Sequence, residues 1–306
     1  MPPYAPPAPP QSSPQGPIVV LGDTQRTTWE EVVFMWREQN EAARLALIQK
    51  IATEEHPAFV VHLGDMVESG GSAQNWEYFD RLVSPLTVRK IQILPVLGNH
   101  DHWGSEKALR QSIQKRFPVL GANGFYKKEH AGLGLVWLDS NLHGAAGAQQ
   151  SAWLDQVLAE FGRNDAVRGV VLFMHHPAYT NGKSRHGEPY VQREVLPRFF
   201  AAPKTVALLS GHVHGYERFV VRGREFVVTA GGGGPRVEYE LPPEAPYVPA
   251  YNTKTDSRRP FNYVVMQPTS TGLDFTVKCL NTDGDCPSGI LEKFAVAFPT
   301  ADQRQP

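Results

Sequence analysis

The sequence contains very little cysteine, no long apolar segment and no excess of charge of one sign. Cys279 and Cys286 are its only cysteines, which is too few for a closed zinc site built from thiolates. No apolar run approaches the ~18 residues of a membrane-spanning helix. The 30 Lys and Arg residues nearly balance the 31 Asp and Glu residues. We therefore expect neither a nucleic-acid platform nor a basic face for an anionic membrane surface.

The N-terminal segment, MPPYAPPAPPQSSPQG, also lacks the basic and apolar regions of a secretory signal peptide. Its proline content predicts a disordered or polyproline tail over residues 1–16. Hydrophobic residues make up 41% of the chain, enough for one substantial core. We expect a single folded domain over residues 17–300. If the protein is exported, its signal is absent from this sequence.

The two cysteines lie close together in KCLNTDGDCP, where turn-forming residues fill the gap. A disulfide that closes a small loop is feasible here, and the alternative is two unrelated thiols. A disulfide would favour an exported protein, periplasmic or extracellular, over a cytoplasmic one.

Apolar runs that end in polar residues alternate with helical patterns along the chain. Six such runs, which we expect to be strands, end at Asp23, Asp65, Asn99–Asp101, Asp139, His175–His176 and His212–His214. Helices are expected over residues 28–55 and 76–88. In the first of these, the predicted buried residues are Trp29, Val32, Val33, Trp36, Leu45, Ile48 and Ile51.

The last strands, in EFVVTAGGGG, FNYVVMQP and GLDFTVKCL, have no helices between them. Alternating strands and helices predict an α/β fold with a largely parallel sheet, and the late strands predict a second, more mixed sheet. The simplest arrangement has four layers: two sheets packed face to face, with helices outside.

Polar residues gather where the strands end, which is where open α/β sheets bind ligands. The candidate metal ligands are Asp23, Asp65, Asn99, His175, His212 and His214. Each alone has an ordinary alternative, such as a helix cap or a polar turn. Together they suit two divalent cations, either Mn, Fe, Zn or Ni. The His-x-His spacing would direct one imidazole at each of two cations about 3.5–4 Å apart.

The order of GD, GDMVESG, GNHD, MHHP and GHVH resembles the calcineurin-like metallophosphoesterase superfamily, from Ile18 to about Ala230. GHVHGYER is especially similar to purple acid phosphatases and their bacterial relatives. The resemblance implies a double β-sandwich (αββα) and one catalytic domain. It also implies hydrolysis of phosphate esters by a hydroxide that two metal ions activate.

Roles for the motif residues follow from the same resemblance. Asp65 would bridge two metal ions, with Asp23 and His214 on the first. Asn99, His175 and His212 would hold the second ion.

The GNHD block carries the candidate catalytic residues His100 and Asp101. His100 would contact the substrate phosphate or protonate the leaving oxygen, and Asp101 would orient its ring.

Two positions depart from the family pattern. Gln25 stands where many members have a histidine, so its amide would ligate the first ion more weakly or act through water. Glu68 stands where purple acid phosphatases have a tyrosine, so no iron–phenolate colour is expected. We expect Glu68 to face solvent, with a role as an extra ligand as the alternative.

The substrate is expected to be a small-molecule phosphate ester, and a monoester first. The alternatives are a phosphodiester or a nucleotide, cyclic or not, and a non-catalytic scaffold. Candidate substrate contacts are Asn99, His100, His176, Arg185 and His186. The loop that carries Arg185 and His186 could equally be a solvated surface loop. We read TAGGGGPR, residues 229–236, as a flexible rim loop, because it lacks the Lys-Ser/Thr of a phosphate-binding P-loop.

Overall fold

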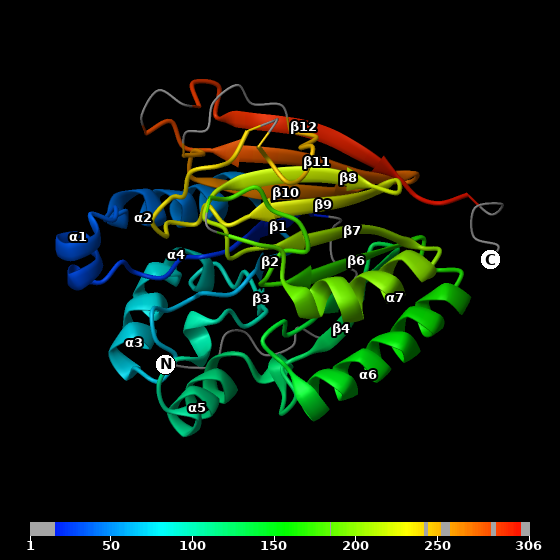
Figure 1. Cartoon of the computed structure of the whole chain (residues 1–306), viewed down its shortest axis with the longest axis horizontal. Coiled ribbons are helices and arrows are strands. Elements are labelled where there is room, and N and C mark those ends of the chain that lie inside the picture. Colours follow the sequence, from blue (N-terminus) through cyan, green and yellow to red (C-terminus); the bar gives the residue numbers. More distant parts are fainter. Residues whose placement is uncertain (1–15, 184, 242–243, 252–257, 283–285, 301–306) are drawn as a thin grey trace.

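The computed structural model describes residues 16–183, 185–241, 244–251, 258–282 and 286–300 (Figure 1). Most of the predicted N-terminal tail, residues 1–15, therefore lies outside the described residues. No helix in the described part of the chain is long and apolar enough to cross a membrane.

The first sheet has six strands in the order β12-β11-β10-β1-β2-β3. They are β1 (Ile18–Leu21), β2 (Phe59–His62), β3 (Ile93–Pro95), β10 (Asn262–Pro268), β11 (Gly272–Cys279) and β12 (Ile290–Ala297). β1, β2 and β3 are parallel, and β10 pairs with β1 antiparallel. The carboxyl ends of the three parallel strands therefore meet at one edge.

The second sheet also has six strands, in the order β4-β5-β6-β7-β9-β8. They are β4 (Tyr126–His130), β5 (Leu133–Trp137), β6 (Gly169–Met174), β7 (Thr205–Ser210), β8 (Tyr216–Val221) and β9 (Arg224–Thr229). β5, β6, β7 and β9 run parallel, with antiparallel strands at both edges.

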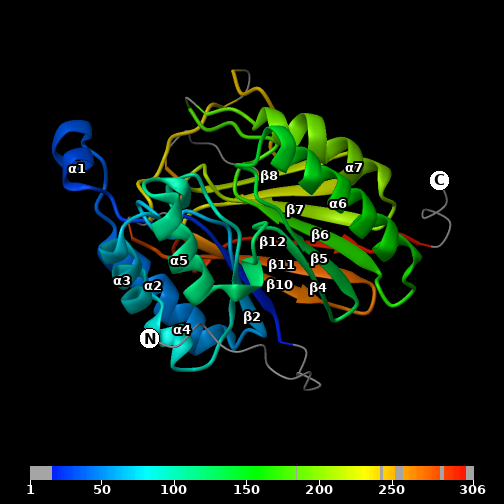
Figure 2. The ribbon, with the colours of Figure 1, turned by 90° about the horizontal axis from the view of Figure 1, so that it is seen from below.

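Helices lie on the outer sides of the two sheets (Figure 2). The α-helices are α1 (Trp29–Met35), α2 (Glu41–Lys50), α3 (Ala73–Leu82), α4 (Ser84–Thr87), α5 (Glu106–Arg116), α6 (Gly144–Arg163) and α7 (Leu196–Ala201). Shorter turns of other helix types are η1 (Ile51–Glu55), η2 (His100–His102), η3 (Pro118–Leu120) and η4 (Val191–Val195).

One continuous hydrophobic core joins both sheets. It includes Val20 and Phe275 from the first sheet, Phe173 and Leu209 from the second, and Leu47 from α2. A second core fills the space between the other face of the second sheet and helices α6 and α7. This is the expected four-layer α/β arrangement. The late strands do not form a sheet of their own, because β8 and β9 join the second sheet and β10, β11 and β12 extend the first.

The helix predicted over residues 28–55 is divided into α1, α2 and η1, and part of its predicted buried side was wrong. Ile48 and Ile51 are buried as expected, but Trp29, Val33, Trp36 and Leu45 are exposed. Trp36 has a positive φ of 53°, which ends α1 and breaks the helical periodicity there.

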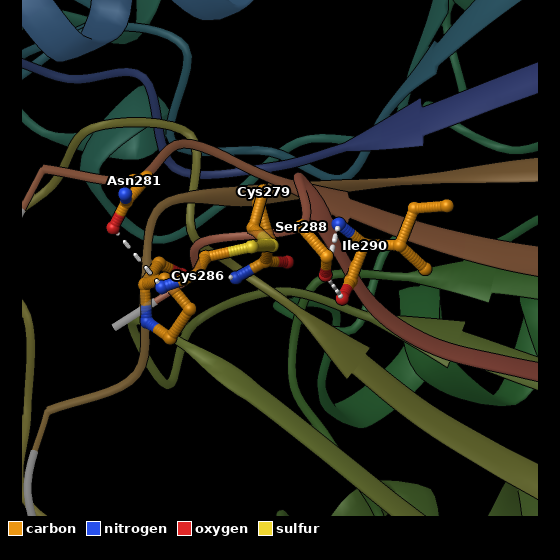
Figure 3. Close-up of a disulfide and its surroundings, with 7 residues drawn as sticks. Cys279, Asn281, Cys286, Ser288 and Ile290 are labelled. Carbon is orange, nitrogen blue, oxygen red and sulfur yellow. Dashed lines mark hydrogen bonds between the residues drawn. A yellow bond between two sulfur atoms is a disulfide. The ribbon is translucent and has the colours of Figure 1, made fainter. Parts of the chain in front are cut away.

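The predicted disulfide between Cys279 and Cys286 is present, and both cysteines are buried. Figure 3 shows it at the end of β11, beside Asn281, whose side-chain oxygen accepts a hydrogen bond from the backbone N–H of Cys286. The Cα atoms are 6.3 Å apart, within the usual range for a disulfide.

A buried ion pair ties α5 to α3 and provides a stability test. The guanidinium of Arg116 donates to both carboxylate oxygens of Asp80, at 2.8 Å each. Arg116→Ala would leave that carboxylate buried without its guanidinium partner. We expect the free energy of unfolding, measured in urea, to fall by about 3–5 kcal/mol.

Arg110 is the matched control because it lies on the same helix and forms a solvent-exposed ion pair with Glu106 at 2.8 Å. Arg110→Ala should change the free energy of unfolding by less than about 1 kcal/mol. Equal losses in the two variants would contradict a special cost of the buried pair.

Candidate metal centre

The predicted ligands meet at the edge where the parallel strands of both sheets end. The ligand atoms of Asp23, Asp65 and His214 lie within 4.8 Å of one another. So do those of a second group, His175, His176 and His212.

Asp65 and Asn99 link this second group to the rest of the centre. His175 Nε2 is 3.4 Å from Asp65 Oδ2. The side-chain oxygen of Asn99 lies 3.1 Å from His175 Nε2 and 3.0 Å from His212 Nδ1. All six predicted ligands are therefore brought together.

Three candidate ligands at this edge have an unusual backbone conformation. Asp23, Asp65 and His212 have φ values of 64°, 52° and 69°, in the left-handed region that non-glycine residues rarely adopt. Strain of this kind collects at functional sites, where it aims side chains. Gly98 explains part of the GNHD motif, because a Cβ there would overlap the Asp65 carboxylate.

Backbone carbonyls fix the orientation of two ligand histidines. The Nδ1 atom of His175 lies 2.8 Å from the carbonyl oxygen of Leu63, and that of His214 lies 2.8 Å from the carbonyl oxygen of Pro235. In each ring Nδ1–H therefore donates, which leaves Nε2 free to face the cluster. Leu63 lies beyond β2 in the first sheet, whereas His175 follows β6 in the second.

Gln25 lies within the first group. Its Nε2 is 3.2 Å from Asp65 Oδ2 and 3.1 Å from His214 Nε2. Its Oε1 is buried and has no hydrogen-bond partner among the residues that the structure describes. A buried amide oxygen, on a side chain that lies beside Asp65 and His214, is an available ligand for a cation.

Burial creates an electrostatic need for a cation. It raises the pKa of Asp23. The pKa of Asp65 is lowered, because the charge and hydrogen bond of His175 and the nearby His100 outweigh the effect of burial. Burial alone would lower the pKa of His175, but the Asp65 and Asp23 carboxylates raise it to about 9. The carboxylates of Asp23 and Asp65 therefore create a negative potential at His175, which bound divalent cations would neutralise.

The residues present fit a pair of divalent cations. The cluster supplies carboxylate, amide and imidazole donors, and these suit Mn, Fe, Zn or Ni. Asp23, Asp65, His214 and the amide of Gln25 would hold one ion. Asp65 would be shared with the other ion, held by Asn99, His175 and His212.

His100 lies beside the cluster, but Asp101 does not orient its ring as we expected. His100 Nδ1 lies 3.1 Å from the carbonyl oxygen of Glu68, and its Nε2 is 4.0 Å from Asp65 Oδ2. The fully buried Asp101 carboxylate instead accepts backbone N–H bonds from Met66, Val67 and Gly98, at 2.9–3.2 Å. Asp101 therefore holds together the loops that carry Asp65 and Asn99.

The side chain of Glu68 is half-buried and accepts a hydrogen bond from Asn75 at 3.2 Å. Aromatic side chains that could stack on a substrate base or aryl group include Trp103, Tyr126 and Tyr216. Trp103 packs on the His100 ring with centroids 3.8 Å apart, whereas Tyr126 and Tyr216 are buried in the core.

The glycine-rich segment, residues 229–236, is not the flexible rim loop that we predicted. Its first residues are buried, and the N–H groups of Gly232 and Gly234 donate to the carbonyls of Gly22 and Asp23. It continues to Pro235, which orients His214. The segment therefore packs under the first half of the centre. Sequence reasoning missed it because glycines signal freedom and close packing alike.

The candidate substrate contacts lie at different depths. His176 is held by Ser140, whose hydroxyl oxygen lies 2.8 Å from its Nδ1. Ser140 was missed, although it follows directly on Asp139 at the end of the fourth run. The pKa of His212 is lowered by burial first, and the charge of Arg185 contributes. His186 is exposed, and Lys183 forms an ion pair with Glu238 at 3.1 Å.

The chain is similar to known phosphoesterases. Residues 16–216 match the calcineurin-like phosphoesterase family. Over 212 residues, 66% of this chain and 45% of the relative, it is 25% identical to purple acid phosphatase 22 of Arabidopsis thaliana. Over 271 residues, 75% of this chain and 71% of the relative, it is 24% identical to a nucleotide pyrophosphatase/phosphodiesterase of Hordeum vulgare.

A solved structure shares the fold. Purple acid phosphatase PPD1 from yellow lupin (Lupinus luteus) seeds matches 95% of this chain with a TM-score of 0.71, at 16% identity. The chain covers 55% of that protein, so it spans about half the length of both purple acid phosphatases. The family match extends over well more than half of the chain. The chain therefore belongs to the calcineurin-like phosphoesterase family.

Proposed function

We propose that this protein is a metal-dependent hydrolase of phosphate esters and that phosphomonoesters are its main substrates. The observation that carries the proposal is the meeting of two ligand groups around Asp65, with His100 beside them. Residues 17–300 would act as one catalytic domain, since a single core joins the two sheets. The alternative of a non-catalytic scaffold predicts lost ligands, and all six ligands are present.

Bound divalent cations would supply a hydroxide at neutral pH and neutralise charge on the phosphoryl oxygens. The chain itself would position the ester. Asn99 and His176 lie at the second group, where their side chains can contact phosphate oxygens. Ser140 accepts a hydrogen bond from the backbone N–H of His176. If its hydroxyl in turn donates to Nδ1, the opposite nitrogen, Nε2, carries a hydrogen that it can donate to phosphate.

His100 is suited to manage the proton of the leaving group. The Glu68 carbonyl engages Nδ1, so Nε2 is the atom turned toward the centre. The indole of Trp103 packs on the ring and restricts its rotation. When both ring nitrogens carry a proton, a histidine fixed in this way can deliver the one on Nε2 to the leaving oxygen while the P–O bond breaks.

Phosphodiester hydrolysis is the second candidate, supported by the similarity to the barley nucleotide pyrophosphatase/phosphodiesterase. The same residues would serve either ester. The two substrates differ only in that a phosphodiester carries a second ester group on one of the phosphate oxygens. The buried disulfide supports an oxidising location, periplasmic or extracellular.

The role of Asp65 can be tested by Asp65→Asn. Removal of the shared carboxylate charge should empty at least one ion position and lower turnover by at least ~100-fold, since even residues that only orient ligands cost 10–100-fold. Metal content by mass spectrometry and hydrolysis of p-nitrophenyl phosphate measure both effects. Asp139→Asn is the control, because Asp139 is equally buried but bonds to His102 and Asn141. Unchanged metal content in Asp65→Asn would exclude the proposed bridge.

His100 can be tested by His100→Ala, which should lower kcat by about 100-fold or more with metal content unchanged. The loss should be greater for an alkyl phosphate than for p-nitrophenyl phosphate, because an alkoxide needs the proton more. His56→Ala, at an exposed position between η1 and β2, is the control and should change kcat little. Equal losses on both substrates would contradict proton transfer by His100.

The ester class can be decided with p-nitrophenyl phosphate and bis-p-nitrophenyl phosphate. The chelated protein should be inactive and should regain activity with Mn, Zn, Fe, Ni or Mg, with the monoester turned over faster. Faster turnover of the diester would favour the second candidate. Hydrolysis of neither ester with any of these metals would contradict the proposed activity.

A further inference from the structure

The most unusual surface of the molecule is the segment of residues 26–40, here called the α1 projection. Its tip carries large apolar side chains that face solvent. The exposed fractions are 62% for Trp29, 54% for Val33, 70% for Phe34, 57% for Met35 and 87% for Trp36. Helix α1 buries none of its residues. Figures 1 and 2 show it standing out from the body of the protein, beyond α2.

The tip is an ordered structure with its own polar supports. Thr28 and Glu31 form a reciprocal capping box at the start of α1. The guanidinium of Arg37 donates to Glu31 at 2.6 Å and closes the far end onto the first turn. The rings of Trp29 and Phe34 lie 5.9 Å apart. These bonds hold the helix in shape without packing from the rest of the protein.

The base of the projection is fastened to the rim of the metal centre. Glu38 pairs with Arg236 at 2.9 Å and with Arg258 at 3.1 Å. Burial would raise the pKa of Glu38, but its bonds to Arg236 outweigh it and lower the pKa. The side-chain amide of Asn40 donates to the carbonyl of Gly234, beside Pro235. The base that carries this apolar tip is therefore held in place by ion pairs and a hydrogen bond at the edge of the site.

Its charges argue against a lipid surface as the partner. The first turn of α1 carries Glu30 and Glu31, and its last turn has no basic residue. Helices that lie in membrane interfaces are instead rich in Lys and Arg on the polar face. A seven-residue helix also offers little length for such binding.

The area of the tip fits a second copy of the same chain. A large aromatic side chain has roughly 150–250 Å² to bury. With the exposed fractions above, the five side chains offer on the order of 600 Å². Two such tips in contact would bury at most on the order of 1,200 Å², which reaches the about 1,000 Å² expected of a specific interface. Apolar and aromatic surface is also what homodimer interfaces favour, and a two-fold axis lets one patch meet itself.

We propose that the α1 projection is the dimerisation surface of this protein and that it packs against the α1 projection of a second copy. Trp29, Phe34 and Trp36 are the anchors of that contact. The base of the projection adjoins Gly234 and Pro235, so the contact between the tips is connected through the projection to the rim of each copy's own metal centre.

The test is sedimentation velocity of the full chain over a range of concentrations. The wild type should form a dimer that dissociates on dilution. Phe34→Ser with Trp36→Ser should be monomeric over the same range, with the dissociation constant raised at least 100-fold. Val248→Ser is the matched control, since Val248 is also 87% exposed but lies elsewhere, and it should remain dimeric. The urea midpoint and the metal content should be the same in all three proteins.

Three outcomes would overturn the proposal. The wild type could be monomeric at every concentration, or the double variant could dimerise as strongly as the wild type. The Val248→Ser control could also weaken the dimer as much as the double variant does. Flotation with phosphatidylcholine vesicles adds a further arm. A monomeric wild type that floats with vesicles, and a double variant that does not, would assign the tip to a lipid surface instead.

Discussion

The structure depends on the burial of two carboxylates, Asp23 and Asp65, at the same place. Burial of a carboxylate carries a large free-energy cost unless a positive charge or hydrogen bonds compensate it. Here the compensation comes from a ring of imidazoles, an amide and backbone N–H groups, and the N–H of His212 donates to both oxygens of Asp23. Carboxylate, amide and imidazole groups are also the ligands that divalent cations take in proteins, which is the physical basis of the proposed chemistry.

The two sheets provide this arrangement because their parallel strands end along a common edge. The bond between His175 and the Leu63 carbonyl crosses from one sheet to the other, so the packing of the sheets determines the geometry of the centre. The Asp101 carboxylate also joins the two ligand loops, because it accepts hydrogen bonds from three backbone N–H groups in them. The rigidity of the centre is therefore a property of the whole fold and not of the ligand loops alone.

The same edge also carries the α1 projection, and the two features share a support. The glycine-rich segment contacts the first half of the centre through Asp23 and His214, and it receives the base of the projection through Gly234 and Arg236. The base of the projection is held to the protein by polar bonds, whereas the apolar side chains of its tip face solvent. The base of the projection, rather than its tip, therefore adjoins the rim of the candidate centre.

The sequence by itself determined the α/β class and most of the strands, and it pointed to the six candidate ligands that the structure brings together, because strand ends and ligand motifs are local patterns that a chain carries in order. It did not predict the exposed face of α1 or the packed glycine-rich segment. It also misassigned Asp101. Helical periodicity shows which apolar residues share a face, but not whether another segment covers that face, and Trp36 is 87% exposed. Only the tertiary structure decided these points, since the partners of Asp101, His214 and His175 lie in segments that are distant in sequence and meet when the sheets pack.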